Sequence, residues 1–200
     1  MGGGFHALIA RPSLSNTIIA GNTAAIVGGS YLGSNAEASL SHCIIAENSA
    51  RFGPGGAAYI YNSSPRLPLC TITANVADST GGGLHFSSKT CWPALVNCTL
   101  WGDTPYEISG EETPPENITL TYCNVEGGYD GEGNWDAPPR FRFMGRFDYL
   151  LGPNSPCIDR GTGEDDGVDG ARIDPRYGRI NSSAPDIGAY GAPGAAGWFP

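Results

Sequence analysis

Short stretches of alternating apolar and polar residues recur along the chain, separated by Gly, Asn and Pro. The clearest stretch occupies residues 17–22 and returns at 43–48, 70–75, 98–103 and 123–128, with spacings of 26, 27, 28 and 25 residues. A Gly-Gly pair recurs between these stretches and begins at positions 3, 28, 55 and 82. Two markers that share one period indicate a solenoid, in which each unit buries its apolar face against its neighbours.

The pattern inside each unit predicts strands rather than helices. Thr, Ile, Val and Cys alternate with period two, and turn residues interrupt them every 6–10 residues, which is typical of short strands. No window carries a helical i, i+3, i+4 apolar pattern of useful length. We therefore predict an all-β fold, a right-handed parallel β-helix of about five coils of 25–28 residues over 1–128. Residues 129–200 are predicted to form an irregular cap packed on the last coil.

The alternation also assigns residues to the two faces of each strand. Four cysteines share one repeat position and are predicted to form a buried column of free thiols beside an inward aliphatic column. The side chains that close the stretches are predicted to form a ladder between coils. The sequence leaves open whether Cys91 or Cys157 forms a disulfide. The inward positions are Cys43, Ile45, Cys70, Ile72, Cys98, Leu100, Cys123, Val125, Ala57, Tyr59, Leu84 and Phe86, and the ladder is Asn22, Asn48, Asn75 and Asp103.

Composition and charge narrow the function classes. The 200 residues include 30 Gly and 16 Pro, yet 40% are hydrophobic and only 16% are charged, which indicates a folded, turn-rich protein rather than a disordered one. A net charge of −9 argues against nucleic acid or an anionic membrane as the main partner. No run of 18 apolar residues predicts a membrane span. Residues 1–13 lack the pattern of a signal peptide.

The later part of the chain carries more specific motifs. Residues 123–128 and 131–136, the run YLLGPNSPCID at 149–159, and DIGAY at 186–190 resemble the last coil and C-terminal signature of bacterial right-handed parallel β-helix repeat proteins. That resemblance covers nearly the whole chain. It implies an extracellular or cell-surface protein with a pectate-lyase-like fold, a group in which many members have no assigned activity. Gly191, in place of the usual acidic residue, and the sequence of 137–141 depart from the signature.

The first functional hypothesis is a surface or carbohydrate-binding module that forms part of a longer protein. Aromatic and histidine side chains on outward positions suit stacking on sugar rings of a polysaccharide or cell-surface glycan. The first coil has no cap before it, so self-association through that coil is a second expected contact. The predicted carbohydrate-binding residues are His6, Tyr31, His42, His85, Trp101 and Tyr122.

The alternative hypothesis is a polysaccharide hydrolase or lyase. The resemblance implies either a basic residue beside Asp-bound calcium or closely spaced carboxylates, and neither arrangement is evident on the strands. Asp103, Glu107 and Glu126 are the carboxylates nearest the regular sheet, and a raised pKa on one of them would support a general acid. A possible calcium loop lies further on, although it lacks EF-hand spacing. Its predicted ligands are Asp165, Asp166, Asp169 and Asp174.

Overall fold

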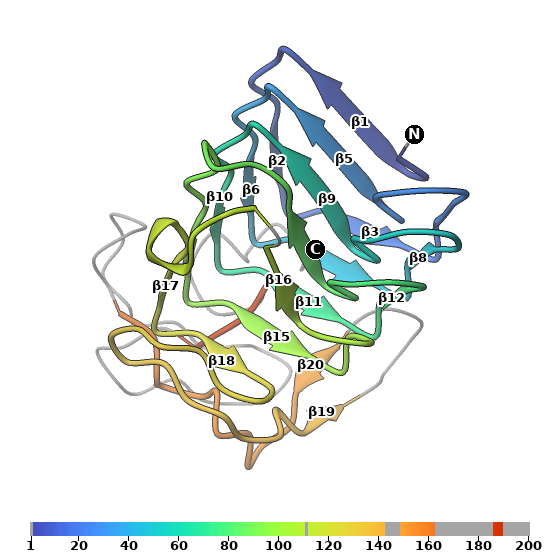
Figure 1. Ribbon diagram of the computed structural model, residues 1–200. Coiled ribbons are helices and arrows are strands. Elements are labelled where there is room, and N and C mark those ends of the chain that lie inside the picture. Colours follow the sequence, from blue (N-terminus) through green and yellow to red (C-terminus); the bar gives the residue numbers. More distant parts are fainter. Residues whose placement is uncertain (1, 111, 143–148, 163–185, 190–200) are drawn as a thin grey trace.

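The chain folds as an all-β parallel solenoid. A computed structural model describes residues 2–110, 112–142, 149–162 and 186–189. Its coils stack from β1 to β18 and make about four turns (Figure 1). One short 3-10 helix, η1 (Pro115–Asn117), interrupts the strands. In the part of the chain that the structure describes, no helix is long and apolar enough to cross a membrane.

Each complete coil contributes one strand to each of four parallel sheets. The first sheet contains β1 (Phe5–Leu8), β5 (Tyr31–Ser34), β9 (Ala58–Tyr61), β13 (Leu84–Phe86) and β16 (Ile108–Ser109). The second contains β2 (Ser13–Ser15), β6 (Ser39–Ser41), β10 (Arg66–Pro68), β14 (Ala94–Val96) and β17 (Thr119–Thr121). The third contains β3 (Ile18–Ala20), β7 (Ile44–Ala46), β11 (Thr71–Thr73), β15 (Thr99–Trp101) and β18 (Asn124–Val125). The fourth contains β4 (Thr23–Ala24), β8 (Ser49–Ala50) and β12 (Val76–Ala77).

The number of turns is therefore about four rather than the predicted five. The fourth sheet has strands only in the first three coils, since no strand of that sheet follows β15 or β18. Residues beyond β18 pair with the last coil instead, and Trp135 donates its backbone N–H to the carbonyl of Cys123 at 3.0 Å. The boundary predicted at residue 128 between coils and cap stays a prediction.

The third sheet confirms the predicted core columns. Ile19, Ile45, Ile72, Leu100 and Val125 lie in register across the five strands. The four cysteines of the repeat lie one residue before these strands, are fully buried and carry free thiols. Cys91 and Cys157 are also free and buried. The aliphatic and thiol columns belong to one hydrophobic cluster at the centre of the solenoid.

The predicted Asn ladder is present and is built the same way in each coil. Asn48 Oδ1 accepts hydrogen bonds from Asn22 N at 3.0 Å and Asn22 Nδ2 at 2.9 Å. Asn75 Oδ1 accepts the corresponding pair from Asn48 at 3.0 and 2.9 Å. The second Nδ2 hydrogen of each buried Asn goes to a strand carbonyl, that of Ile19 for Asn48 and that of Ile45 for Asn75. Asp103 Oδ1 accepts from Asn75 N and Nδ2 and ends the ladder.

Glycines of the recurrent pair allow the coils to approach closely at one corner. A Cβ on Gly29 would overlap the carbonyl oxygen of Gly56, and a Cβ on Gly56 would overlap that of Gly82. These positions face the next coil directly, so a methyl group could fit only if the coils moved apart. The composition rich in glycine is therefore a requirement of coil stacking.

The C-terminal part of the chain covers the outer face of the third sheet. Strands β19 (Phe141–Arg142) and β20 (Leu150–Leu151) pair antiparallel, and Tyr149 and Ala189 pack on Ile44 and Ala46. Ala189 N donates to Thr71 Oγ1 at 3.0 Å. We call residues 149–162 and 186–189 the strap. The strap explains why Ile44, an outward residue by alternation, is fully buried.

One outward and one inward assignment in the first sheet are wrong, those of Tyr31 and Tyr59. Tyr31 lies in register with Phe5 and Ala58, not with His6, so it points into the core and stacks on Phe5 at 5.1 Å between ring centroids. Tyr59 lies in register with Leu32 and His85 and belongs to the outward row. The cause is one additional residue between the glycine pair and the strand in the second and third coils, before β5 and β9, because a single-residue slip exchanges the two faces of a strand.

Candidate functional site

The six predicted carbohydrate-binding residues do not form one surface. His6 is exposed, and Trp101 and Tyr122 are partly buried. Tyr31, His42 and His85 are buried, with exposed fractions of 2%, 7% and 2%. His42 and Tyr122 have positive φ at the corner between the second and third sheets, while Trp101 lies in β15. The prediction that these six residues are exposed on the surface is therefore wrong for Tyr31, His42 and His85.

The side chain of His85 lies on the outer face of β13, yet neighbouring residues bury it. Its ring stacks on Tyr59 at 5.3 Å between centroids with an interplanar angle of 13°. Its Nδ1 hydrogen-bonds Ser109 Oγ at 2.8 Å and Thr80 Oγ1 at 3.2 Å. These contacts fix β13 to β16 and to the preceding turn, so His85 has a structural role in this arrangement.

The three predicted acidic residues do come together. Asp103, Glu107 and Glu126 line one hollow of about 570 Å³ beside the last coil, with Tyr106 and Tyr129. Glu126 Oε2 accepts a hydrogen bond from Gly102 N at 2.7 Å, so the exposed carboxylate is anchored at the corner that precedes Asp103. A larger hollow of about 1060 Å³ adjoins it and shares residues 108 and 127–129.

Asp103 and Glu107 form a buried acid pair at the end of the Asn ladder. Each has only 6% of its surface exposed. Glu107 Oε1 accepts a hydrogen bond from the backbone N–H of Asp103 at 2.9 Å, while Asp103 Oδ1 is occupied by Asn75. Asp103 Oδ2 and Glu107 Oε2 are buried and receive no hydrogen bond from another group of the described residues. A proton shared by the two carboxyl groups supplies the missing donor.

The electrostatics agree with a shared proton. Burial is the largest cause of the raised pKa of Glu107, and the charge of Asp103 raises it further. Burial also raises the pKa of Asp103, against the lowering effect of its hydrogen bonds with Glu107 and Asn75. Two adjacent buried carboxyl groups cannot both ionise at low cost, so the pair retains one proton at neutral pH. The buried oxygens leave this acid inaccessible to a substrate in the hollow.

A second surface, which the repeat pattern did not identify, lies at the corner between the first and second sheets. Two hollows of about 760 and 420 Å³ share Glu37 and Ser64 and form one continuous groove. We call it the corner groove. Its polar and aromatic lining residues are Arg11, Asn35, Glu37, Ser39, Asn62, Ser64, Arg66, Thr90 and Trp92.

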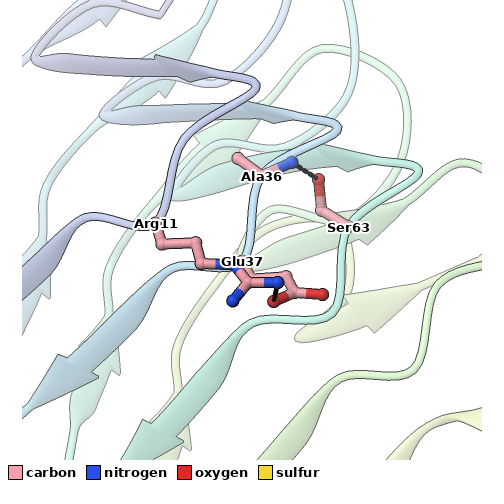
Figure 2. Close-up of polar contacts among 4 residues, drawn as sticks. All are labelled: Arg11, Ala36, Glu37 and Ser63. Atoms are coloured by element: carbon pink, nitrogen blue, oxygen red, sulfur yellow. Dashed lines mark hydrogen bonds and ion pairs between the residues drawn. The ribbon is translucent and has the colours of Figure 1, made fainter.

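The side chains of the corner groove come from successive coils. Figure 2 shows Arg11 of the first coil extended toward Glu37 of the second, and their Nη2 and Oε2 atoms are 3.0 Å apart. In the same view Ser63 Oγ of the third coil accepts a hydrogen bond from Ala36 N at 2.9 Å. Because the Arg11–Glu37 pair is largely exposed, we assign it little contribution to stability.

Trp92 closes the groove at the fourth coil. Its side chain is 59% exposed, and its backbone N–H donates to Ser64 Oγ at 3.2 Å. Nearby, Asn62 Oδ1 accepts from Thr90 Oγ1 at 2.9 Å and also from Ser88 Oγ. These bonds fix the loop between β13 and β14, which holds a flat aromatic side chain at the groove and open to solvent. The spacing of 28 residues between Cys70 and Cys98, the longest in the chain, was the available signal for this loop.

The predicted calcium ligands Asp165, Asp166, Asp169 and Asp174 lie outside the described residues. Among residues 2–110, 112–142, 149–162 and 186–189, no three His, Cys, Asp or Glu side chains are grouped to hold a metal ion. The calcium site therefore stays a prediction.

No protein-family model matches this chain. No curated protein and no solved structure matches it significantly either. The parallel solenoid is thus established by the structure, whereas the resemblance to the pectate-lyase-like group stays a prediction.

Proposed function

We propose that this protein is a carbohydrate-binding β-solenoid of the cell exterior and that the glycan lies in the corner groove. The observation that carries the proposal is Trp92, a large exposed aromatic beside hydrogen-bonding groups in a continuous groove. Exposed Trp rings provide an apolar face and a polar edge, which suits the faces and hydroxyl groups of sugar rings. Asn62, Ser64 and Thr90 supply hydrogen-bonding groups next to it.

The direction of the groove suits a polymer. Arg11, Glu37, Ser64 and Trp92 belong to four successive coils, and parallel strands stack about 4.8 Å apart. Contacts to an extended chain can therefore repeat from coil to coil along the solenoid. The resemblance of residues 149–159 and 186–190 to pectate-lyase-like proteins supports a polysaccharide as the ligand and an extracellular location.

A binding function is better supported than hydrolysis. An acid catalyst must reach the leaving oxygen of the substrate. The oxygens that share the proton of Asp103 and Glu107 are buried, and Glu126 alone offers an accessible carboxylate in that hollow. The corner groove, in contrast, presents its polar groups at the surface.

The test is binding of the purified chain to a glycan array, followed by calorimetry with the best soluble ligand. The W92A variant should weaken binding at least about tenfold, as loss of a central aromatic contact does. F52A removes an aromatic that is 73% exposed and does not line the groove, so it should bind like the wild type. Equal binding by W92A and wild type would place the ligand elsewhere. New reducing ends or unsaturated products during incubation would instead favour the enzyme hypothesis.

A further inference from the structure

The end of the Asn ladder differs chemically from the rest of the ladder. At Asn48 and Asn75, Nδ2 donates one hydrogen to a carbonyl of the preceding coil and the other to the next Oδ1. Asp103 stands at the same repeat position but has no such donor. Its Oδ2 and the Oε2 of Glu107 are therefore buried acceptors that depend on a proton taken from solvent.

The two carboxyl groups that would share this proton lie at the two ends of a surface turn, Asp103 at the end of the ladder and Glu107 where the turn meets β16. Thr104, Pro105 and Tyr106 are exposed, and the turn ends in β16, a strand of two residues at the edge of the first sheet. Backbone hydrogen bonds tie the turn to the two preceding coils. Thr104 N donates to Asn75 O of the third coil at 2.9 Å, and Leu84 N of the fourth coil donates to Glu107 O at 2.8 Å. On its other side the turn faces the hollow with Glu126 and Tyr129.

We propose that Asp103 and Glu107 form a proton-operated latch on the turn at 104–107: with one shared proton the turn is closed on the ladder, and loss of that proton opens it and widens the hollow lined by Tyr106, Glu126 and Tyr129. No other reactant is needed, because closing takes one proton from water and opening returns it. The latch is independent of the carbohydrate-binding proposal, which rests on a different corner of the solenoid, between the first and second sheets.

The charged groups around the pair act in the same direction. Glu126, which follows β18, raises the pKa of both carboxyl groups through its negative charge. Tyr149 of the strap is within electrostatic reach of Asp103, but its hydroxyl is neutral, because burial and its hydrogen bond to Glu47 raise its pKa. Neither group supplies a cation that would stabilise two carboxylates. Deprotonation therefore places two negative charges together in a buried site, with opening of the turn as the way to hydrate them.

Amide hydrogen exchange at residues 104 and 106–109 tests the latch. The exchange rate of the wild type is measured from pH 5 to 8 and divided by that of E107Q at each pH. Gln at position 107 can donate an N–H to Asp103 Oδ2 without a titrating proton, so E107Q should stay closed at every pH. Opening of the wild type releases one proton, so the ratio should rise about tenfold per pH unit between the open-state and closed-state pKa values. D78N, which removes an exposed carboxylate elsewhere, should keep the wild-type slope.

A flat ratio would overturn the latch, because it would show that opening involves no proton. A carbon-detected NMR titration gives a second, independent reading. The closed wild type should show one carboxyl of the pair still protonated at neutral pH. Ordinary acidic titration of both Asp103 and Glu107 would also overturn the proposal, even if E107Q failed to fold.

Discussion

Tyr149 Oη donates a hydrogen bond to Glu47 Oε1 at 2.8 Å, which joins two residues 102 positions apart in the sequence. The ring of Tyr149 also packs against Phe141 at 5.4 Å between centroids in an edge-to-face arrangement. Glu47 occupies a left-handed corner of the second coil, with φ of 54°. The contact therefore fastens the strap to a coil far from the strands that immediately precede the strap in sequence.

Two substitutions of Tyr149 should separate the contribution of its hydrogen bond to stability from the contribution of its ring packing. We expect Y149F to lower the free energy of unfolding by about 1 kcal/mol, the usual value of one net hydrogen bond. Y149A should cost about 3–5 kcal/mol, because the side chain is 95% buried and a cavity would remain. Urea unfolding measures both. Y61F, at a position 42% exposed, should change nothing, and an equal cost for Y149F and Y149A would contradict the assignment.

Replacing Asp103 by Asn and replacing Asn75 by Asp should change the stability of the protein in opposite directions. D103N restores the amide found in the preceding coils and gives Glu107 a donor, so we expect about 1 kcal/mol of stabilisation at neutral pH. N75D removes the Nδ2 bonds to Ile45, Thr73 and Asp103 and adds a buried carboxylate beside Asp103. It should cost about 3–5 kcal/mol. Stabilisation by both substitutions, or by neither, would be inconsistent with the ladder geometry.

The acid pair also sets a pH dependence of stability. Above the ordinary carboxyl pKa the unfolded pair has lost its protons while the folded pair keeps one. The free energy of unfolding of the wild type should therefore fall as the pH rises from that ordinary pKa toward the raised folded pKa. E107Q should show a shallower slope over the same range. Thermal unfolding at a series of pH values measures this, and a wild type that gains stability with rising pH, parallel to E107Q, would refute the assignment.

Two glycines should respond differently to a methyl group. In G56A the new Cβ would meet the backbone of the next coil, so we expect a loss near 3 kcal/mol, at the upper end of overpacking costs. Gly127 has open space around it but φ of 81°, so G127A should cost only about 1–2 kcal/mol from backbone conformation. Chemical denaturation of the two variants gives the order, and a larger cost for G127A would contradict close stacking at Gly56.

The thiols offer a chemical check of the core. All six cysteines are buried and unpaired with one another by disulfides, so a thiol reagent should label none of them rapidly in the native protein. Six thiols should react after denaturation without reductant. Four reactive thiols in the denatured chain would instead reveal one disulfide.

Sequence periodicity located the parts of the fold that repeat. Cys43 and Ile45 were assigned to the core correctly, because strand alternation and coil spacing agree at that position. Tyr31 was misassigned because the glycine marker and the strand register differ by one residue in the second coil. Ile44 is buried by the strap, a contact between distant segments that local alternation cannot reveal. Trp92 lies in a loop of the longest coil, and repeats carry no information about a segment that does not repeat.

The pair of Asp103 and Glu107 could be predicted only in part from the sequence. The sequence placed Asp103 on the ladder and grouped it with Glu107 and Glu126 as the carboxylates nearest the regular sheet. It could not show that Glu107 folds back to the backbone N–H of Asp103, because that contact depends on the conformation of a turn without a regular pattern. Whether any of these residues acts on a glycan stays a prediction.

The strap gives the solenoid a direction of unfolding. Ile18 and Ile44 occupy the same register position, yet Ile18 is 40% exposed and Ile44 is fully buried beneath strap residues. Strap residues contact Ile44, Thr71 and Asn97 of the second, third and fourth coils, whereas Ile18 of the first coil is not among the residues they cover. Loss of structure should therefore spread from the blue end of Figure 1 toward the last coil, and the strap should release only after the coils it covers have begun to separate.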